Sequence, residues 1–447
     1  MALLAILSFA NENGLARTPP MGWRSWNLYG ANVNQTLMQR VMDGMVRRDR
    51  LVDGVPTSLC DLGYCDVGLD DNWQQCGSYG AEGYTYHDEQ GNPIVNTHRF
   101  PSFKNMTSYA HALGLTSGWY GNNCICQDKK TAASKFYAGD VKALREYGFD
   151  SIKLDGCGAQ VDLQLWDDLI KATAPTTGRK AIMVENCHWG SVVPFEPTAT
   201  WCPWNFFRTS GDIRAAYASV VGNLQTTIKY ATSGLSRPGC WAYPDMLEVG
   251  CKHGPGGESD KGLTPTETKA HFAAWAIISS PLTLSHDVND PNITDQIWDV
   301  ITNKEAIAVN QAWAGHSGSP FKQSDEIIIL DEINYAALPR HSKVEKHYSL
   351  GPTAVAAYQF LYKPLERASE VSGSPRTAVL MMNHAILEMT MTLKFSEIPG
   401  VTCTTCQIRD IWAKKDLGTF NGNYTVTVAP HDAPFLIISD PTSRKLA

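Results

Sequence analysis

The sequence is poor in charge and has no excess of positive charge. Charged residues make up 19% of the 447 residues, where about 25% is ordinary, and 38 Lys and Arg stand against 45 Asp and Glu. A net charge of −7 without basic runs excludes the electrostatic pattern of a nucleic-acid-binding protein. We therefore expect neutral partners and no nucleic acid among them.

Long hydrophobic runs are also missing. Beyond residues 1–10 (MALLAILSFA), no window holds the roughly 18 consecutive apolar residues of a membrane-spanning helix, so we expect no membrane contact. Residues 1–10 resemble the apolar region and the small-residue end of a signal peptide. The twelve histidines show no His-Glu-x-x-His or comparable spacing, so we expect neither a metal nor another cofactor.

Tryptophan and cysteine are abundant instead. Thirteen Trp residues are typical of a large core, and Trp is also the side chain that best covers the apolar face of a sugar ring. Twelve Cys residues spread along the chain favour disulfide bonds in an oxidising compartment. Sequons at Asn34, Asn105, Asn292 and Asn423 agree with a secretory route. We predict a secreted, vacuolar or lysosomal glycoprotein.

Short apolar segments that end in polar residues recur through the first three hundred positions. The eight segments are Met21–Trp26, Asp66–Asp71, Thr116–Gly121, Ser151–Gly156, Ala181–Cys187, Phe206–Asp212, Cys240–Met246 and Pro281–Asp287. Their starts lie 25 to 50 residues apart, which leaves room for a helix after each strand. Two of these helices are visible, one over Tyr137–Gly148 with apolar residues three and four apart, and one opening at a Thr264 capping box and ending near Ser279. The pattern predicts an α/β fold, a (β/α)₈ TIM barrel over residues 11–315.

The pattern of apolar and polar residues changes after about Asn310. Short apolar or alternating segments, separated by Gly, Pro, Asn and Asp, predict an antiparallel β-sandwich over residues 320–447. These segments are Glu326–Leu330, Ala354–Leu361, Thr377–Met382, Met389–Phe395 and Tyr424–Ala429. We expect the linker between the two domains near Ala314–Pro320.

Polar side chains are concentrated where the predicted barrel strands end. They are Trp26, Asp70, Asp71, Tyr120, Lys153, Asp155, Arg208, Asp212 and Asp245. In such barrels the carboxyl ends of the strands line the active site. Asp155 and Asp212 end the fourth and sixth strands, so both carboxylates should face the same mouth. Two carboxylates across a pocket are the minimum set for cleaving a glycosidic bond.

Five segments at these strand ends resemble glycoside hydrolase family 27, which contains α-galactosidases and α-N-acetylgalactosaminidases. They are Asn13–Trp26 (NGLARTPPMGWRSW), Leu69–Trp73 (LDDNW), Ser151–Cys157 (SIKLDGC), Arg208–Ile213 (RTSGDI) and Pro244–Met246 (PDM). The match runs from about residue 13 to 313. The resemblance implies a retaining double displacement, with Asp155 as nucleophile and Asp212 as general acid/base. We expect Lys153 to keep Asp155 ionised, and burial together with the charge of Asp155 to raise the pKa of Asp212.

The resemblance also implies the residues that bind the sugar. Trp26 would pack on the sugar face, Asp70 and Asp71 would accept hydrogen bonds from the 4- and 6-hydroxyls, and Lys153 would reach the 3- and 4-hydroxyls. The remaining contacts would come from Tyr120 near Asp155, from Cys157 and Trp189, and from Arg208 and Asp245 on the far wall.

His188 departs from the family pattern, in which Glu or Ser usually stands in the segment that reads the substituent at carbon 2. The adjacent Trp189-Gly190 resembles plant α-galactosidases, which favours a free 2-hydroxyl. His188 can hydrogen-bond to either substituent, or can serve only to orient Arg208 or a carboxylate.

Several disulfide bonds are expected. By resemblance, Cys157 should pair with Cys124 (Cys126 is the alternative), and Cys187 with Cys202. Cys240 with Cys251 is a plausible local bridge, and Cys403 with Cys406 should close a small structural loop. We do not assign Cys60, Cys65 or Cys76.

We predict an α-galactosidase that releases terminal α-linked galactose from oligosaccharides or glycoconjugates, as a monomer or homodimer. The alternatives within the family are an α-N-acetylgalactosaminidase and a β-L-arabinopyranosidase. An alternative from another class is a catalytically silent sugar-binding protein.

Overall fold

A computed structural model describes residues 13–81, 83–122, 133–175, 181–252, 262–330 and 353–443. The expected signal peptide, residues 1–10, lies outside these ranges, and so do Cys124 and Cys126. Within them, no helix has both the length and the apolar character required to cross a bilayer.

Eight parallel strands form the central sheet, in the order β10-β1-β4-β5-β6-β7-β8-β9. The strands are β1 (Met21–Arg24), β4 (Asp66–Gly68), β5 (Thr116–Gly121), β6 (Ser151–Asp155), β7 (Met183–Cys187), β8 (Phe206–Arg208), β9 (Trp241–Tyr243) and β10 (Leu282–Leu284). Each lies inside one of the eight segments predicted from sequence. The two outermost strands are linked by the Leu247 N–H just after β9, which donates to the Thr283 carbonyl of β10 at 2.8 Å.

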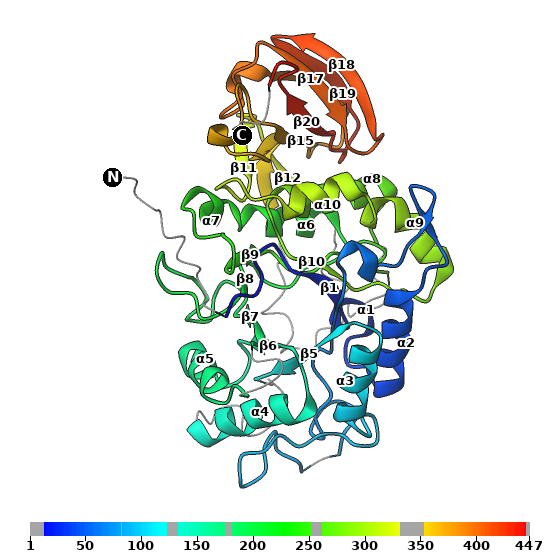
Figure 1. Cartoon of the computed structure of the whole chain (residues 1–447), viewed down its shortest axis with the longest axis vertical. Helices are drawn as coiled ribbons and strands as arrows, with labels where there is room; N and C mark the ends of the chain where they lie inside the picture. The colour runs from blue at the N-terminus through cyan, green and yellow to red at the C-terminus, as the bar shows by residue number, and fades with distance from the viewer. Residues whose placement is uncertain are drawn as a thin grey trace.

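Helices surround this sheet in a ring, as Figure 1 shows. They are α1 (Trp26–Tyr29), α2 (Gln35–Val46), α3 (Phe103–Ala112), α4 (Ser134–Tyr147), α5 (Leu163–Ala172), α6 (Tyr217–Gln225), α7 (Ile228–Thr232), α8 (Pro265–Ile277), α9 (Pro291–Ile301) and α10 (Lys304–Gln311). The helix predicted over Tyr137–Gly148 is α4, which begins three residues earlier and ends before Gly148. The capping box is confirmed: Thr264 Oγ1 accepts from the Glu267 N–H, and Glu267 accepts from the Thr264 N–H.

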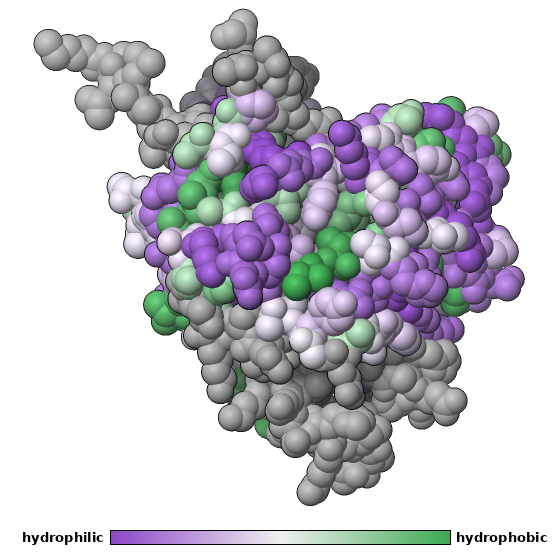
Figure 2. All heavy atoms as spheres, turned by 90° about the horizontal axis from the view of Figure 1, so that it is seen from below, coloured by the Kyte–Doolittle hydropathy of each residue, from purple (hydrophilic) through white to green (hydrophobic). Residues whose placement is uncertain are grey.

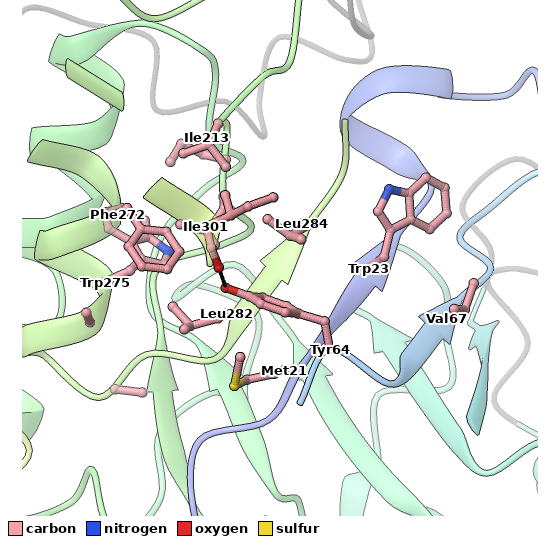
Figure 3. Packing of buried hydrophobic residues seen from close by; sticks show 14 of the residues in the cluster. Met21, Trp23, Tyr64, Val67, Ile213, Phe272, Trp275, Leu282, Leu284 and Ile301 are labelled. Atoms are coloured by element: carbon pink, nitrogen blue, oxygen red, sulfur yellow. Dashed lines mark hydrogen bonds between the residues drawn. The ribbon is translucent and has the colours of Figure 1, made fainter. Parts of the chain in front are cut away.

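The space between strands and helices is filled by large buried side chains. Figure 3 shows Met21 and Trp23 of β1 beside Leu282 and Leu284 of β10, with Phe272 and Trp275 of α8 on the same cluster. The Tyr64 hydroxyl lies among them and donates to the Ile301 carbonyl at the end of α9, at 2.8 Å. A buried phenol needs such a partner, because an unpaired hydroxyl would cost free energy.

The C-terminal part is antiparallel. Its six-stranded sheet has the order β11-β14-β15-β20-β17-β18, and two-stranded ribbons β12–β13 and β16–β19 accompany it. The strands are β11 (Ser319–Gln323), β12 (Ile327–Leu330), β13 (Thr353–Ala356), β14 (Tyr358–Pro364), β15 (Thr377–Asn383), β16 (Met389–Lys394), β17 (Thr405–Asp410), β18 (Lys415–Asn421), β19 (Asn423–Val428) and β20 (Phe435–Ser439). A minor ribbon, β2 (Leu51–Val52) with β3 (Val55–Pro56), belongs to the first half of the chain.

The sequence located this antiparallel region but not all of its strands. The segment predicted as one strand, Ala354–Leu361, is divided between β13 and β14, because β13 pairs with β12 whereas β14 pairs with β11 and β15. Strands β11, β17, β18 and β20 were not predicted. In β18 most side chains are exposed, so the strand has no apolar alternation that sequence analysis can detect.

The antiparallel sheets rest on α8 and α10, as Figure 1 shows. The hydrophobic core continues from the barrel into β15 through Leu380 and Met382. Arg409 forms an ion pair with Glu305 of α10 at 2.6 Å. The domain limits near residues 315 and 320 stay a prediction.

Figure 2 shows the face of the molecule that is seen from below the view of Figure 1. Hydrophilic residues dominate the coloured part of this face, and hydrophobic residues form several small areas, one of them near the centre. The face shows no broad apolar surface among its coloured atoms.

The disulfide pairing differs from the prediction. Cys202 bonds to Cys240, and Cys60 bonds to Cys65. The predicted bond between Cys403 and Cys406 is confirmed. The predicted pairs Cys187–Cys202 and Cys240–Cys251 are therefore wrong. Cys202 and Cys240 precede β8 and β9, at the amino-terminal end of the barrel. Cys187 ends β7 and Cys251 follows β9, so each predicted pair would have had to span the barrel from end to end.

Candidate active site

The structure brings the predicted polar side chains together at the carboxyl ends of the strands. β6 carries Lys153 and Asp155 on one face, because side chains two apart point the same way. Neighbouring strand ends supply Trp26, Asp70, Asp71, Tyr120, His188, Trp189, Arg208, Asp212 and Asp245. Most of these side chains are buried, although they are polar. Buried polar groups in such numbers must bind each other or a ligand.

Only one carboxylate oxygen of Asp155 accepts a hydrogen bond from the described residues. The Tyr120 hydroxyl donates to Oδ2 at 2.6 Å, and the side-chain amide of Asn122 donates to the Asp155 main-chain carbonyl. Oδ1 is buried and has no hydrogen-bond partner among the described residues. A carboxylate oriented in this way presents one oxygen to a reactant in a fixed direction.

Burial raises the pKa of Asp155 to about 7. Lys153 and the Tyr120 hydroxyl both lower this pKa, while Asp212 raises it. Lys153 therefore acts in the expected direction, although desolvation has the larger effect on the pKa of Asp155; the role of Lys153 in keeping Asp155 ionised stays a prediction. Lys153 also has another partner: its Nζ lies 2.8 Å from Oδ2 of Asp70.

Asp212 is the more accessible of the two carboxylates, with 24% of its side chain exposed. Nη2 of Arg208 donates to its Oδ1 at 2.9 Å. Asp212 is therefore half-buried, less than the expectation of burial implies. The two carboxylates still belong to one site, since the charge of Asp212 raises the pKa of Asp155 and also that of Asp245.

Asp70 and Asp71 follow β4 and are fixed by short bonds. Asp70 accepts from Lys153 on Oδ2 and from the Asp71 N–H on Oδ1 at 2.9 Å. Oδ1 of Asp71 accepts from the Asn72 N–H at 2.7 Å. Each carboxylate oxygen accepts more than one hydrogen bond, so both residues retain acceptor capacity for sugar hydroxyls.

Asp245 lies behind Arg208 and holds it. Its Oδ2 is 2.9 Å from Nη2 of Arg208 and accepts from the Ile213 N–H, and its Oδ1 accepts from the Met246 N–H. The backbone of Asp245 has φ +90°, which is unusual for a non-glycine residue. With both oxygens bonded to protein, Asp245 orients the guanidinium that binds Asp212.

His188 is fully buried, and its Nδ1–H donates to the Pro194 carbonyl at 2.7 Å. Burial lowers its pKa to about 4, so the imidazole is neutral near pH 7. Nε2 has no partner within the described chain. The bond to Pro194 opposes the alternative in which His188 orients Arg208 or a carboxylate, since no such bond is present in the described part of the site.

Sequence analysis missed two features of the β7 end. Nη1 of Arg208 donates to Sγ of Cys187 at 3.4 Å, so the thiol expected in a disulfide is a free, buried neighbour of the site. Two residues earlier on the same face, Glu185 forms a buried ion pair with Arg24 of β1 at 2.8 Å. The alternation of β7 was the signal, because Glu185 and Cys187 point the same way.

Cys157 follows β6 and is disulfide-bonded; its expected partners lie outside the described ranges. Trp26, half-buried at the start of α1, packs against the cluster formed by Phe206, Trp241, Tyr243 and Met246. No group of three or more His, Cys, Asp or Glu side chains in the described ranges is arranged to hold a metal ion. The predicted absence of a cofactor stays a prediction.

Known proteins were compared with the chain. A family model described as "Alpha galactosidase A" matches residues 18–312, about two thirds of the sequence. The chain belongs to this family. A second model, "Alpha galactosidase C-terminal beta sandwich domain", matches residues 356–438. The resemblance to glycoside hydrolase family 27 and the barrel-plus-sandwich fold are thereby confirmed.

Individual relatives agree with this assignment to the alpha-galactosidase A family. The chain is 28% identical over 435 residues to "Alpha-galactosidase" of Oryza sativa subsp. japonica, covering 96% of this chain and 87% of the relative. It is 30% identical over 351 residues to "Alpha-galactosidase A" of Cellvibrio japonicus, covering 72% and 76%. The crystal structure of alpha-galactosidase I from Mortierella vinacea superimposes with a TM-score of 0.70 at 24% identity, covering 96% and 98%.

Proposed function

We propose that the protein is a retaining α-galactosidase with Asp155 as nucleophile and Asp212 as general acid/base. The observation that carries this proposal is the contrast between the two carboxylates. Asp155 is buried and oriented by the Tyr120 hydroxyl, and its Oδ1 has no hydrogen-bond partner among the described residues. Asp212 is partly exposed to solvent and forms an ion pair with Arg208. A nucleophile needs a fixed free oxygen, whereas an acid/base must reach both the leaving group and water.

In the first half-reaction, Oδ1 of Asp155 forms a bond to the anomeric carbon of galactose. The bond from that carbon to the aglycone oxygen breaks, and Asp212 gives this oxygen its proton. The products of the step are a galactosyl ester on Asp155, an Asp212 carboxylate and the free alcohol.

In the second half-reaction, Asp212 takes a proton from water, and the water oxygen attacks the anomeric carbon. The ester bond breaks and its electron pair returns to Asp155. Two inversions leave galactose with the α-configuration that it had in the substrate. Esterification of Asp155 removes its negative charge from the site, and this loss favours the ionised form of Asp212 that accepts the proton from water. Hydrolysis of the ester restores the negative charge of Asp155.

The proton that the reaction needs is shared between two coupled groups. In the free enzyme burial favours the proton on Asp155, and Nη2 of Arg208 donates a hydrogen bond to Oδ1 of Asp212. The productive form carries the proton on Asp212, and the reaction draws on the fraction of enzyme with this placement.

The substrate class follows from the acceptors beside Lys153. Asp70, Asp71 and Lys153 would hydrogen-bond the hydroxyls at carbons 3, 4 and 6, so a sugar with an equatorial 4-hydroxyl would leave buried acceptors unpaired. Trp26 would cover the apolar face of the ring. A pentopyranoside lacks the 6-hydroxymethyl group that this arrangement would bind, which favours galactose over arabinose.

At carbon 2 we propose that the free hydroxyl is read by His188 and Trp189. Trp189 is only 9% exposed, and its backbone adopts the left-handed region with φ +54°. We further propose that Cys157 contributes to this side of the pocket.

The reaction is tested by comparing three p-nitrophenyl glycosides: α-galactoside, α-N-acetylgalactosaminide and β-L-arabinopyranoside. We expect the highest kcat/KM on the α-galactoside, and NMR of the reaction mixture should show α-galactose before mutarotation. Faster hydrolysis of the N-acetyl substrate would transfer the assignment to that alternative. Binding of galactose without turnover of any of the three would favour the sugar-binding protein.

We propose a secreted, vacuolar or lysosomal protein that acts as a monomer or homodimer. The disulfide bonds Cys60–Cys65, Cys202–Cys240 and Cys403–Cys406, together with the disulfide-bonded state of Cys157, support an oxidising route. The sequon residues Asn105, Asn292 and Asn423 are exposed, while Asn34 is half-buried as the N-cap of α2. Glycopeptide mass spectrometry of the protein from a secretory host should therefore find glycans at the three exposed positions first.

A further inference from the structure

A cavity of about 340 Å³ lies at the amino-terminal end of the barrel, opposite the proposed active site. It is lined by Arg17 before β1, by Arg237 and Pro238 before β9, and by Trp313 and His316 between α10 and β11. Its volume is in the range of small-molecule sites, which begin near 300 Å³. The proposed hydrolysis uses none of these residues.

The titratable side chains in the described lining of this cavity, which we call the basal cavity, are all basic. Two Arg and one His line it, and the described lining holds no Asp or Glu. Nη2 of Arg237 donates to the carbonyls of Thr198 and Ala199 at 2.8 and 3.0 Å. These carbonyls orient the guanidinium without neutralising it, and burial alone lowers the pKa of Arg237.

A buried lysine lies behind the lining. Lys363 of β14 is fully buried, and its Nζ donates to the carbonyls of Val309 and Asn310 at the end of α10. Burial lowers the pKa of Lys363 well below its ordinary value, so this side chain supplies no fixed charge and the arginines of the lining carry the electrostatic argument. In the described part of the chain no ion pair balances the charge of Arg237.

The other walls are mostly apolar, with Ser236 and Ser317 as further polar residues of the lining. Trp313 is half-buried and meets Trp241 edge to face, with ring centroids 5.4 Å apart. Ala231 and Pro238 complete this side. A flat side chain next to guanidinium groups suits a ligand with a planar apolar body and an anionic end.

We propose that the basal cavity binds a small organic anion, namely a carboxylate carried on a planar ring. Arg237 and Arg17 would bind the carboxylate, and Trp313 would pack against the ring. This site is independent of sugar hydrolysis and does not rest on the roles of Asp155 and Asp212.

The test uses the full chain and isothermal titration with benzoate, with benzamide as the neutral probe of nearly the same shape. We expect one benzoate per chain and at least tenfold weaker binding of benzamide. Saturating galactose should leave the benzoate affinity unchanged. Equal affinity for the two probes, or displacement of benzoate by galactose, would overturn the proposal.

Two variants locate the site. Arg237→Gln and Arg17→Gln should each weaken benzoate at least tenfold, while Arg367→Gln, an exposed arginine in the antiparallel region, should have no effect. Turnover of p-nitrophenyl α-galactoside reports folding in every variant, and the exposed Arg17 keeps the test valid if Arg237→Gln does not fold. Unchanged benzoate affinity in a folded Arg17→Gln variant would contradict the assignment.

Discussion

Asp155 shows how burial and neighbouring charges compete at a single residue. Lys153 and Tyr120 stabilise its charged form, yet the loss of solvent raises its pKa to about 7. Asp212 keeps part of its side chain in solvent and has Arg208 beside it. The two carboxylates therefore differ in environment, as the different roles of a nucleophile and a general acid/base require.

The first prediction concerns the nucleophile. Asp155→Asn should abolish turnover, with less than a few per cent of the wild-type rate on p-nitrophenyl α-galactoside, because an amide oxygen is a far weaker nucleophile than a carboxylate. Galactose binding, measured by calorimetry, should persist, since Asp70, Asp71 and Lys153 remain. A rate above a few per cent would show that another group attacks the anomeric carbon.

The second prediction concerns the acid/base. Asp212→Ala should spare the first step on activated aryl galactosides, whose leaving groups need no proton, and should slow the second. Azide should restore turnover by attacking the galactosyl ester in place of water, and two inversions should give α-galactosyl azide, identified by NMR. Recovery of the β-azide would contradict a double displacement.

The third prediction concerns pH. The mechanism requires one ionised and one protonated carboxylate, so kcat/KM should fall at low pH, where no nucleophile is left, and at high pH, where no acid is left. Burial raises the pKa of Asp155 to about 7, which places the basic limb near that pH. We expect kcat/KM to fall about tenfold per pH unit above pH 7 and the optimum to lie on the acidic side.

Tyr120→Phe is the matched control for this profile. Its hydroxyl lowers the pKa of Asp155, so its removal should move the basic limb to higher pH. A basic limb that stays in place in the variant would mean that Asp155 does not set it.

At the scale of elements, the strand–loop–helix succession decides which residues can meet. The ends of β8 and β9 illustrate this: their carboxyl ends bring Arg208 and Asp245 within 2.9 Å, and their amino ends bring Cys202 and Cys240 into a disulfide. Function and stability are thereby placed at opposite ends of the same two strands, as is general in this fold.

The fourth prediction follows from this disulfide. Cys202→Ala opens a loop of 38 residues and should lower the free energy of unfolding by about 4 kcal/mol in the chain-entropy account. Cys403→Ala opens a loop of only three residues and should cost less than half as much. Urea unfolding of both variants measures the difference, and equal losses would show that loop closure is not the source of the stabilisation.

At the scale of the whole molecule, the barrel and the antiparallel sheets share one hydrophobic core. Phe272 of α8 meets Trp412, with ring centroids 6.5 Å apart, and Phe435 belongs to the same cluster. The ion pair of Arg409 with Glu305 adds a polar contact across the same boundary. The antiparallel sheets therefore cover an apolar surface that the barrel would otherwise expose.

The fifth prediction tests this dependence. A chain that ends at residue 315 should express as aggregate or as a species that binds hydrophobic dye, because the exposed face of α8 favours association. Size-exclusion chromatography and circular dichroism compare it with the full chain. A monomeric, folded and active product would show that residues 11–315 are stable alone and would also support the proposed boundary.

The eight barrel strands and the identity of the polar residues at their ends were determined by the sequence alone. Apolar periodicity is a local property, and the carboxyl ends of parallel strands necessarily meet at one mouth. The capping box at Thr264 was equally local. The exposed strand β18 was not predicted, because its side chains show no apolar periodicity.

Only the tertiary structure decided which of these side chains pair. Lys153 binds Asp70, Arg208 binds Asp212 and Asp245, and Cys187 keeps a free thiol because its predicted partner lies at the other end of the barrel. The degree of burial, which raises the pKa of Asp155 above the effect of Lys153, is likewise a property of the packed molecule. Distance and desolvation depend on residues remote in sequence, and no local pattern records them.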